Sequence, residues 1–185
     1  MNKKTKILGF AGSLRKNSYN KALLQTASAL MPNDTILQIF DIEGIPVFNQ
    51  DMENQPPQKV KEFKAKIRKT DAILIATPEY NYSIPGTLKN AIDWASRPPH
   101  DNAFNQKPVA IMGASTGRLG TARAQYHLRQ CFIFLNMFPI NKPEVMVDHA
   151  DKKIDDSGTL NDPKTKQLIA ELIANLIEWT KKLKQ

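Results

Sequence analysis

The sequence has only one cysteine and three histidines, and this scarcity excludes several kinds of site. A lone cysteine, Cys131, cannot form a disulfide within the chain or provide the set of thiolates that structural zinc sites use. The histidines His100, His127 and His149 lie far apart and show no metal-ligand spacing. We therefore expect no metal site. Cys131 shares an apolar helical stripe with Leu128, which favours a buried structural thiol over a nucleophile.

Long apolar runs are missing as well. No stretch approaches the roughly 20 apolar residues of a membrane-spanning helix. The first residues, MNKKTKILGFAGS, contain one brief apolar run before a glycine and a serine, which is typical of a first strand and unlike a signal peptide. We expect a cytoplasmic protein that does not cross a membrane. The length of 185 residues, 41% of them hydrophobic and 24% charged, predicts a single globular domain over residues 1–185.

Two common nucleotide-binding motifs are absent. The sequence has no G-x-x-x-x-G-K-[ST], the phosphate loop of many NTPases, and no G-x-G-x-x-G after the first predicted strand. Asp41 could accept a hydrogen bond from a ribose hydroxyl, but without the glycines it is better interpreted as a turn residue. A bound phosphate would therefore belong to a mononucleotide more readily than to a dinucleotide.

The charge is not balanced, because 26 basic and 18 acidic residues give a formal net charge of +8. The lysines concentrate near the two ends of the chain and along a predicted helix, KVKEFKAKIRK, where a solvated face is the usual explanation. No nucleic-acid-binding motif accompanies them, and we expect no nucleic-acid partner.

Short apolar runs alternate with amphipathic stretches along the chain. The predicted strands are Thr5–Phe10, Thr35–Phe40, Ala72–Thr77, Pro108–Ala114 and Glu144–Val147. Between them the apolar spacing predicts helices, and Pro163–Leu183 is expected to be a long closing helix. Residues 41–58 are expected to form a long connection, and residues 148–162 an exposed loop. The order predicts an α/β fold: a doubly wound, five-stranded parallel sheet of strand order 2-1-3-4-5, with helices on both faces.

In such a sheet the ligand lies beyond the carboxyl ends of the strands, beside strands 1 and 3, and the first loop there is AGSLRKNSYNKALL. Ser13, Arg15, Ser18 and Asn20 place hydroxyl, guanidinium and amide groups just before a predicted helix. A helix N-terminus with such donors suits a phosphate group. The alternative is that Ser18 or Asn20 only caps the helix.

The loop after the third strand, PEYNYSIPGTLKNAIDW, is rich in aromatic and amide side chains. Glu79 would repel a phosphate, so this loop is expected to face a planar heteroaromatic ring. Tyr80 or Tyr82 offers an aromatic surface, and Asn81 offers donors and acceptors. The alternative is a proline-fixed turn whose tyrosines pack over a neighbour or a second subunit.

The loop after the fourth strand, GASTGRLGTAR, combines three glycines with hydroxyl side chains. Its backbone N–H groups or Arg118 could stabilise negative charge on a reduced flavin. A glycine-rich turn that only begins the next helix is the alternative.

Together these loops resemble those of the NADPH-dependent FMN reductase family and, within it, those of bacterial chromate and quinone reductases. GSLRKNSYN resembles the family's phosphate loop, G-S-x-R-x-x-S-x-N, and PEYNYSIPGTLKNAIDW resembles its flavin-ring loop. STGRLGTARAQ agrees with the third loop, and the resemblance covers Lys6 to about Val147. It implies a flavodoxin-like fold, bound FMN, and a homodimer or homotetramer.

The resemblance also implies roles for individual residues. The phosphate would be held by Ser13, Arg15, Ser18 and Asn20. The isoalloxazine ring would be bordered by Pro78, Glu79, Tyr80 and Asn81. The pyrimidine side of the ring would contact Ser115 and Gly117.

We therefore expect an NAD(P)H-dependent, FMN-containing oxidoreductase that reduces quinones, flavins or adventitious acceptors such as chromate. Hydride would pass from NADPH or NADH to FMN, and electrons then to the acceptor at the same face, which gives ping-pong kinetics. No catalytic acid or base is expected. Two alternatives stay open: a flavodoxin-like electron carrier without NAD(P)H activity, and a partner-binding protein without flavin. The charge of +8 favours the enzyme, because a basic surface attracts a phosphorylated reductant.

Overall fold

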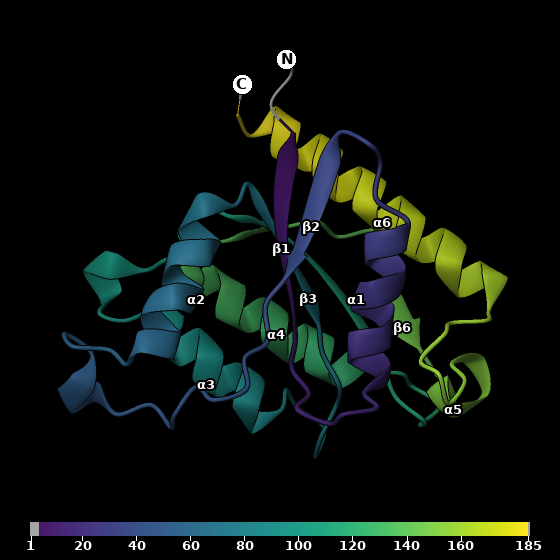
Figure 1. The fold of residues 1–185 in the computed structure, drawn as a ribbon, viewed down its shortest axis with the longest axis horizontal. Coiled ribbons are helices and arrows are strands. Elements are labelled where there is room, and N and C mark those ends of the chain that lie inside the picture. The colour runs from purple at the N-terminus through teal and green to yellow at the C-terminus, as the bar shows by residue number, and fades with distance from the viewer. Residues whose placement is uncertain (1–3, 185) are drawn as a thin grey trace.

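A parallel β-sheet forms the centre of the molecule, and helices cover both of its faces (Figure 1). The computed structural model describes residues 4–184. The strands are β1 (Thr5–Ala11), β2 (Thr35–Ile39), β3 (Ala72–Ala76), β4 (Pro108–Ala114), β5 (Phe138–Pro139) and β6 (Val145–Val147). Their order is β2-β1-β3-β4-β5, with β6 also paired to β4. The predicted flavodoxin-like, doubly wound arrangement is confirmed.

The fifth position of the sheet differs from the prediction, because two short strands share it. β5 pairs with Pro108 and Val109 at the start of β4, whereas β6 pairs with the end of β4. The sequence predicted only the second of these strands, so the sheet has six strands instead of five. Pro139 is the last residue of β5 and Pro143 lies between β5 and β6, and proline has no N–H to donate to a ladder.

Each helix packs an apolar stripe on the sheet. Helices α1 (Tyr19–Ala29) and α6 (Pro163–Lys182) cover one face, and α2 (Gln58–Lys69), α3 (Gly86–Ala95) and α4 (Ala122–Leu135) cover the other (Figure 1). The stripe of α2, Val60, Phe63 and Ile67, is fully buried, as its spacing predicts. The closing helix is confirmed to within one residue of its predicted end. No helix among residues 4–184 is long and apolar enough to cross a membrane.

The two long connections, residues 41–58 and 148–162, both contact the rest of the fold. Residues 41–58 include a short 3-10 helix, Gln50–Met52, and are tied to α3, where Trp94 Nε1 donates to the Pro46 carbonyl at 2.8 Å. Residues 148–162 were expected to be an exposed loop, and this is wrong in part. They contain α5 (Ala150–Lys153), and Ala150, Ile154 and Leu160 are buried because the segment folds back onto the core.

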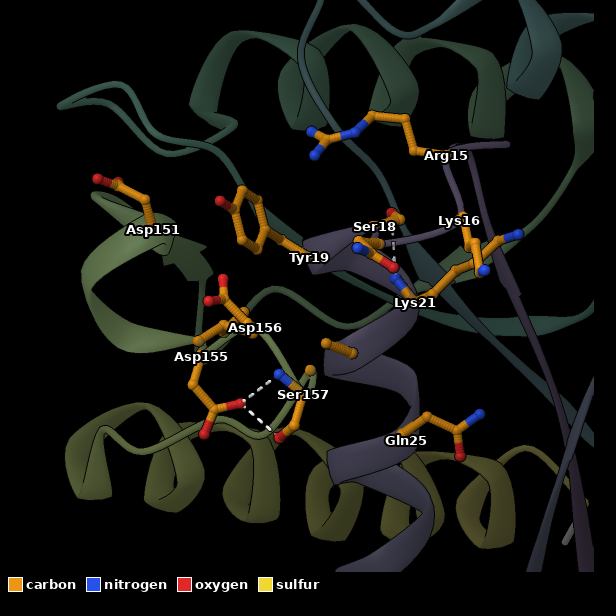
Figure 2. Close-up of a pocket in the computed structure, with 14 residues that line it drawn as sticks. Arg15, Lys16, Ser18, Tyr19, Lys21, Gln25, Asp151, Asp155, Asp156 and Ser157 are labelled. Atoms are coloured by element: carbon orange, nitrogen blue, oxygen red, sulfur yellow. Dashed lines mark hydrogen bonds between the residues drawn. The ribbon is translucent and has the colours of Figure 1, made fainter.

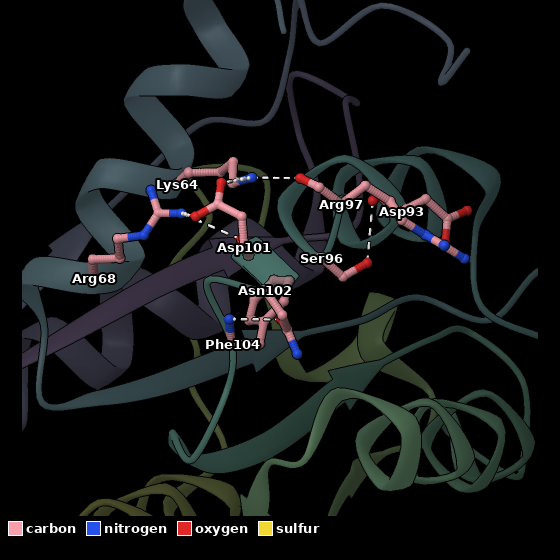
Figure 3. A network of polar contacts seen from close by, with 8 residues as sticks. All are labelled: Lys64, Arg68, Asp93, Ser96, Arg97, Asp101, Asn102 and Phe104. Carbon is pink, nitrogen blue, oxygen red and sulfur yellow. Dashed lines mark hydrogen bonds and ion pairs between the residues drawn. The ribbon is translucent and has the colours of Figure 1, made fainter. Parts of the chain in front are cut away.

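An ion pair between buried Lys64 and the half-exposed Asp101 holds the segment that follows α3 (Figure 3). Lys64 of α2 is buried, and its Nζ donates to Asp101 Oδ2 at 2.7 Å and to the Arg97 carbonyl. Arg68 binds the other oxygen of Asp101 at 2.5 Å. Burial opposes ionisation of Asp101, but the hydrogen bond and charge of Lys64 hold its pKa below the ordinary value. Lys64 therefore differs from the solvated lysines that the sequence predicted along this helix.

Candidate active site

Three loops meet at the carboxyl edge of the sheet, because β1, β3 and β4 are parallel neighbours. Hydrogen bonds where the loops leave the strands hold them side by side. The Gly12 N–H donates to the Ala76 carbonyl at 2.8 Å, and the Thr77 N–H donates to the Met112 carbonyl at 3.0 Å. The hydroxyl of Thr87, at the start of α3, donates to the Gly12 carbonyl at 3.0 Å. The chain thus brings together the three loops that the sequence singled out.

The first loop, residues 12–18, leads from β1 into α1. Ser13 is buried, and Arg15 is exposed with its guanidinium 5.5 Å from the centre of the Tyr19 ring. Ser18 is the N-cap of α1 and accepts a hydrogen bond from the Lys21 N–H at 3.4 Å. The first turn of α1 contains no acidic residue. A helix N-terminus with this charge pattern favours an anion, although Ser18 also performs the capping role considered above.

A cavity of about 560 Å³ adjoins this loop (Figure 2). Arg15, Lys16 and Lys21 contribute positive charge to its lining, and acidic residues of α5 and the segment after it contribute to the facing side (Asp151, Asp155 and Asp156). No residue of the loops after β3 and β4 lines it. The cavity therefore contacts only the phosphate end of the predicted ligand site.

Asn20 has a role that the sequence did not predict. It is buried, its Nδ2 donates to the Ala114 carbonyl at 3.0 Å, and its Oδ1 accepts from the Ala114 N–H at 3.0 Å. Both ends of the amide are thus used to join α1 to the end of β4. Asn20 supports the first loop instead of presenting its whole amide group to a ligand.

The second loop forms a tight hairpin over residues 80–83. Tyr80 and Ser83 exchange backbone hydrogen bonds of 3.1 and 3.0 Å, and Asn81 and Tyr82 have φ values of 50° and 64°. Two central residues with positive φ define a type I′ turn, which is strained for a bulky residue such as Tyr82. Pro78 before the hairpin is buried, whereas Tyr80 and Tyr82 are 49% and 67% exposed. The hairpin therefore presents two aromatic rings at the edge of the sheet.

Glu79 faces helix α4. Its Oε2 accepts hydrogen bonds from the N–H groups of Arg123 and Ala124 at 3.0 and 3.1 Å. Its Oε1 accepts from Arg123 Nε at 2.5 Å. The hydrogen bond to Glu79 raises the pKa of Arg123. The sequence predicted Glu79 at the border of a ring, and the structure adds that its carboxylate is occupied by α4.

The third loop, residues 115–121, is held by its own backbone and hydroxyl groups. Ser115 donates its hydroxyl to the Gly120 carbonyl and its N–H to the Val147 carbonyl at 3.0 Å. Gly117 is exposed. A Cβ at Gly113, where β4 ends, would lie 2.0 Å from Thr121 Oγ1 and 2.4 Å from the Thr77 carbonyl. Only glycine fits at that position, so the second and third loops approach closely.

Several residues that shape the site were missed in the sequence. Thr77, Thr87 and Arg123 each contact a segment far away in the chain, and Arg123 lies 44 positions from Glu79. A local pattern carries no signal for such pairs. Asn20 was found by the loop motif, but its partner Ala114 was not.

Most of the chain is similar to a known family and to individual relatives. Residues 5–152 match the family model described as NADPH-dependent FMN reductase. An NAD(P)H-dependent FMN reductase of Pseudomonas aeruginosa is 52% identical over 180 residues, with 97% of each chain covered. A 2-hydroxy-1,4-benzoquinone reductase of Burkholderia sp is 39% identical over 176 residues, covering 95% of this chain and 96% of the relative.

A solved structure is also similar over nearly the whole chain. The flavoenzyme FerB, an NAD(P)H:(acceptor) oxidoreductase from Paracoccus denitrificans, superposes with a TM-score of 0.87 and is 32% identical. The alignment covers 96% of this chain and 98% of FerB.

Proposed function

The chain belongs to the NADPH-dependent FMN reductase family, and from this premise we propose that it is an NAD(P)H-dependent oxidoreductase that reduces quinones or flavins through bound FMN. The single observation that carries the proposal is the meeting of the three loops at the carboxyl edge of β1, β3 and β4. The similarity to FerB and to the quinone reductase of Burkholderia sp supports the same class of reaction.

The residues present fit the parts of FMN. The exposed guanidinium of Arg15 and the N-terminus of α1 suit a phosphate group, with Ser13 and Ser18 beside them. Asn20 keeps this loop in place through Ala114. The loop after β3 supplies a buried proline and exposed aromatic and amide groups for a flat ring (Pro78, Tyr80 and Asn81). Ser115 and Gly117 would border the pyrimidine side; Gly117 is exposed, whereas the N–H and carbonyl of Ser115 are already bonded to Val147 and Ala150.

The protein's own part in the reaction is binding and orientation. When bound, FMN supplies the hydride and electron chemistry. The phosphate loop would hold one end of the cofactor, while the loops after β3 and β4 would hold its ring. No side chain is assigned as a catalytic acid or base. If NAD(P)H and the acceptor used the same face of the bound cofactor, the nicotinamide would have to leave before the acceptor binds, which is ping-pong turnover.

The range of acceptors follows from this open site. A flavin ring with an exposed edge would discriminate among electron acceptors mainly by their size and redox potential. The proposal therefore includes flavins and adventitious acceptors such as chromate. The net charge of +8 attracts phosphorylated NADPH or NADH. The single cysteine is compatible with the reducing cytoplasm, where we place the protein.

The proposed assembly is a homodimer or homotetramer. Ile133 and Phe134 of α4 are 82% and 69% exposed, and a groove of about 270 Å³ lies beside them between α3 and α4. Large exposed apolar side chains next to a groove are typical of a surface covered by another chain.

Steady-state kinetics test the proposal. Initial rates of quinone reduction are measured over a range of quinone concentrations at several fixed NADPH concentrations. The double-reciprocal plots are expected to give parallel lines. Converging lines would contradict the ping-pong order. Absence of turnover with both NADPH and NADH, in protein that contains FMN, would favour the electron carrier instead.

A further inference from the structure

Helix α4 receives its N-terminal cap from a distant loop. Glu79 Oε2 accepts the N–H groups of Arg123 and Ala124, both in the first turn of α4. Thr121, the local N-cap residue, makes no side-chain cap bond, because its hydroxyl accepts from Gln125 Nε2 at 3.0 Å. The first N–H groups of a helix need partners from outside it, and here the loop after β3 provides them.

The same carboxylate forms an ion pair. Glu79 Oε1 contacts Nε and Nη2 of Arg123, and the Glu79 side chain is only 6% exposed. A carboxylate this deeply buried requires both its charge partner and its hydrogen bonds. Glu79 thus has no freedom to move independently of α4.

The hairpin that follows Glu79 also contacts helix α4. The guanidinium of Arg123 lies 3.6 Å from the centre of the Tyr82 ring, and Ser83 Oγ lies 3.0 Å from His127 Nδ1. These contacts hold Asn81 and Tyr82 at positive φ, a conformation that persists only where its surroundings impose it.

We propose that Glu79 is a positioning residue that locks the second loop (residues 78–83) and the third loop (residues 115–121) into one unit that holds the flavin ring. The third loop runs directly into α4, so a residue of the second loop that caps α4 fixes the distance between the two. This role rests on the proposed function, because it concerns the loops that border FMN. It explains why a carboxylate stands in a loop facing an anionic cofactor: Arg123 and the helix N-terminus neutralise it.

Two consequences follow for Glu79→Gln. Loss of the ion pair frees the two loops from each other, so FMN and riboflavin both bind more weakly, about tenfold as an order of magnitude for one lost charge-assisted contact. Loss of the negative charge of Glu79 leaves the positive charge of Arg123 without its partner, and this positive charge stabilises the anionic reduced flavin. The midpoint potential of bound FMN therefore becomes more positive.

The matched control is Asp101→Asn. Asp101 also binds an arginine through a carboxylate, at 2.5 Å from Arg68. It follows the C-terminal end of α3, and this helix begins at the carboxyl edge of the sheet and runs back toward the opposite edge. The control loses an arginine–carboxylate ion pair away from the proposed flavin ring, and with it the contact of Asp101 to buried Lys64.

The test measures FMN and riboflavin dissociation constants by fluorescence, and the potential of bound FMN, in wild type, Glu79→Gln and Asp101→Asn. The expected result is weaker flavin binding and a more positive potential in Glu79→Gln alone. Failure of either change, or an equal change in Asp101→Asn, would overturn the role of Glu79. Wild-type protein that binds no FMN would overturn the proposed function as well.

A second variant covers the case in which Glu79→Gln does not fold, as judged by circular dichroism. Arg123→Gln removes the ion pair and leaves the backbone N–H groups that Glu79 accepts. It is expected to weaken the binding of both flavins several-fold. Wild-type affinity in a folded Arg123→Gln variant would contradict the locking of the two loops.

Discussion

Arg15 is the side chain that most directly separates phosphate binding from ring binding. It is exposed in the first loop, and its guanidinium lines the cavity there. We predict that Arg15→Ala weakens FMN binding by roughly 1.5–3 kcal/mol, the value of a hydrogen bond to a charged group, and changes riboflavin binding little. Fluorescence titration with both flavins measures the difference. Lys69→Ala, an exposed substitution at the end of α2, is the control, and equal losses for FMN and riboflavin would remove Arg15 from the phosphate site.

Asn20 gives a prediction about stability. Asn20→Ala removes both hydrogen bonds to Ala114 and leaves a buried N–H and a buried carbonyl unpaired. We expect the free energy of unfolding to fall by roughly 2–4 kcal/mol, measured by urea denaturation of flavin-free protein. The exposed neighbour Asn17→Ala should change it by less than about 0.5 kcal/mol. A stable Asn20→Ala variant that loses only FMN would mean that the amide serves the ligand and not the fold.

For single residues, the sequence predicted which ones belong to the candidate site better than it predicted their hydrogen-bond partners. Ser13, Arg15 and Ser18 lie around the start of α1, as their spacing predicted. Asn20 and Glu79 were also found, but their contacts to Ala114 and Arg123 join elements that are far apart in the chain. Such contacts depend on how the strands are ordered, which no local pattern contains. The flavin contacts of all these residues stay predictions.

The close approach of the loops after β3 and β4 depends on one glycine at the end of a strand. A Cβ at Gly113 would overlap Thr121 and the backbone of Thr77, so Gly113→Ala must push the two loops apart. We predict a loss of stability of several kcal/mol, as for other overpacked sites, together with weaker FMN binding. Thermal unfolding and flavin titration measure the two effects.

Gly86→Ala is the control for that substitution. Gly86 is the first residue of α3, and an added Cβ there meets nothing within 4 Å. Alanine also favours a helix, so stability should be unchanged or slightly higher. If the two variants behaved alike, the tight fit at Gly113 would be refuted.

The turn before α6 gives a prediction about acid. Hydrogen bonds from Ser157, Asn161 and the Thr159 N–H lower the pKa of Asp155 to about 2. An unfolded aspartate titrates near ~3.9, so the turn's contribution to stability is complete above that pH and is lost as the pH falls toward 2. Carbon-detected NMR of the Asp155 carboxyl group should give a midpoint near 2. A midpoint at the ordinary value would show that these hydrogen bonds do not persist in solution.

Element prediction succeeded where hydrophobic periodicity was strong. The strands β1, β3 and β4 and the helix α6 match their predicted positions closely, because each buries an apolar run or stripe. The strand β5 was missed, since two residues are too short to make a pattern. The buried side chains around α5 were missed because polar and acidic residues surround Ala150, Ile154 and Leu160.

The topology of the whole molecule followed from the order of its elements. Alternating strands and helices leave few right-handed arrangements, and the observed order is the one predicted. That order brings the loops after β1, β3 and β4 to one edge. The assignment of residues 1–185 to a single FMN-binding domain stays a prediction; residues 1–3 and 185 lie outside the described residues. A single cooperative unfolding transition, seen by both fluorescence and circular dichroism, would support it.

The central claim is that this molecule transfers electrons from a pyridine nucleotide through bound FMN. The most direct measurement is the visible spectrum of purified protein, mixed anaerobically with NADPH or NADH and then with a quinone. Flavin absorption near ~450 nm should bleach on mixing and return with the quinone. A yellow protein that neither nucleotide bleaches would indicate an electron carrier, and a colourless protein that takes up no FMN would contradict the account of all three loops.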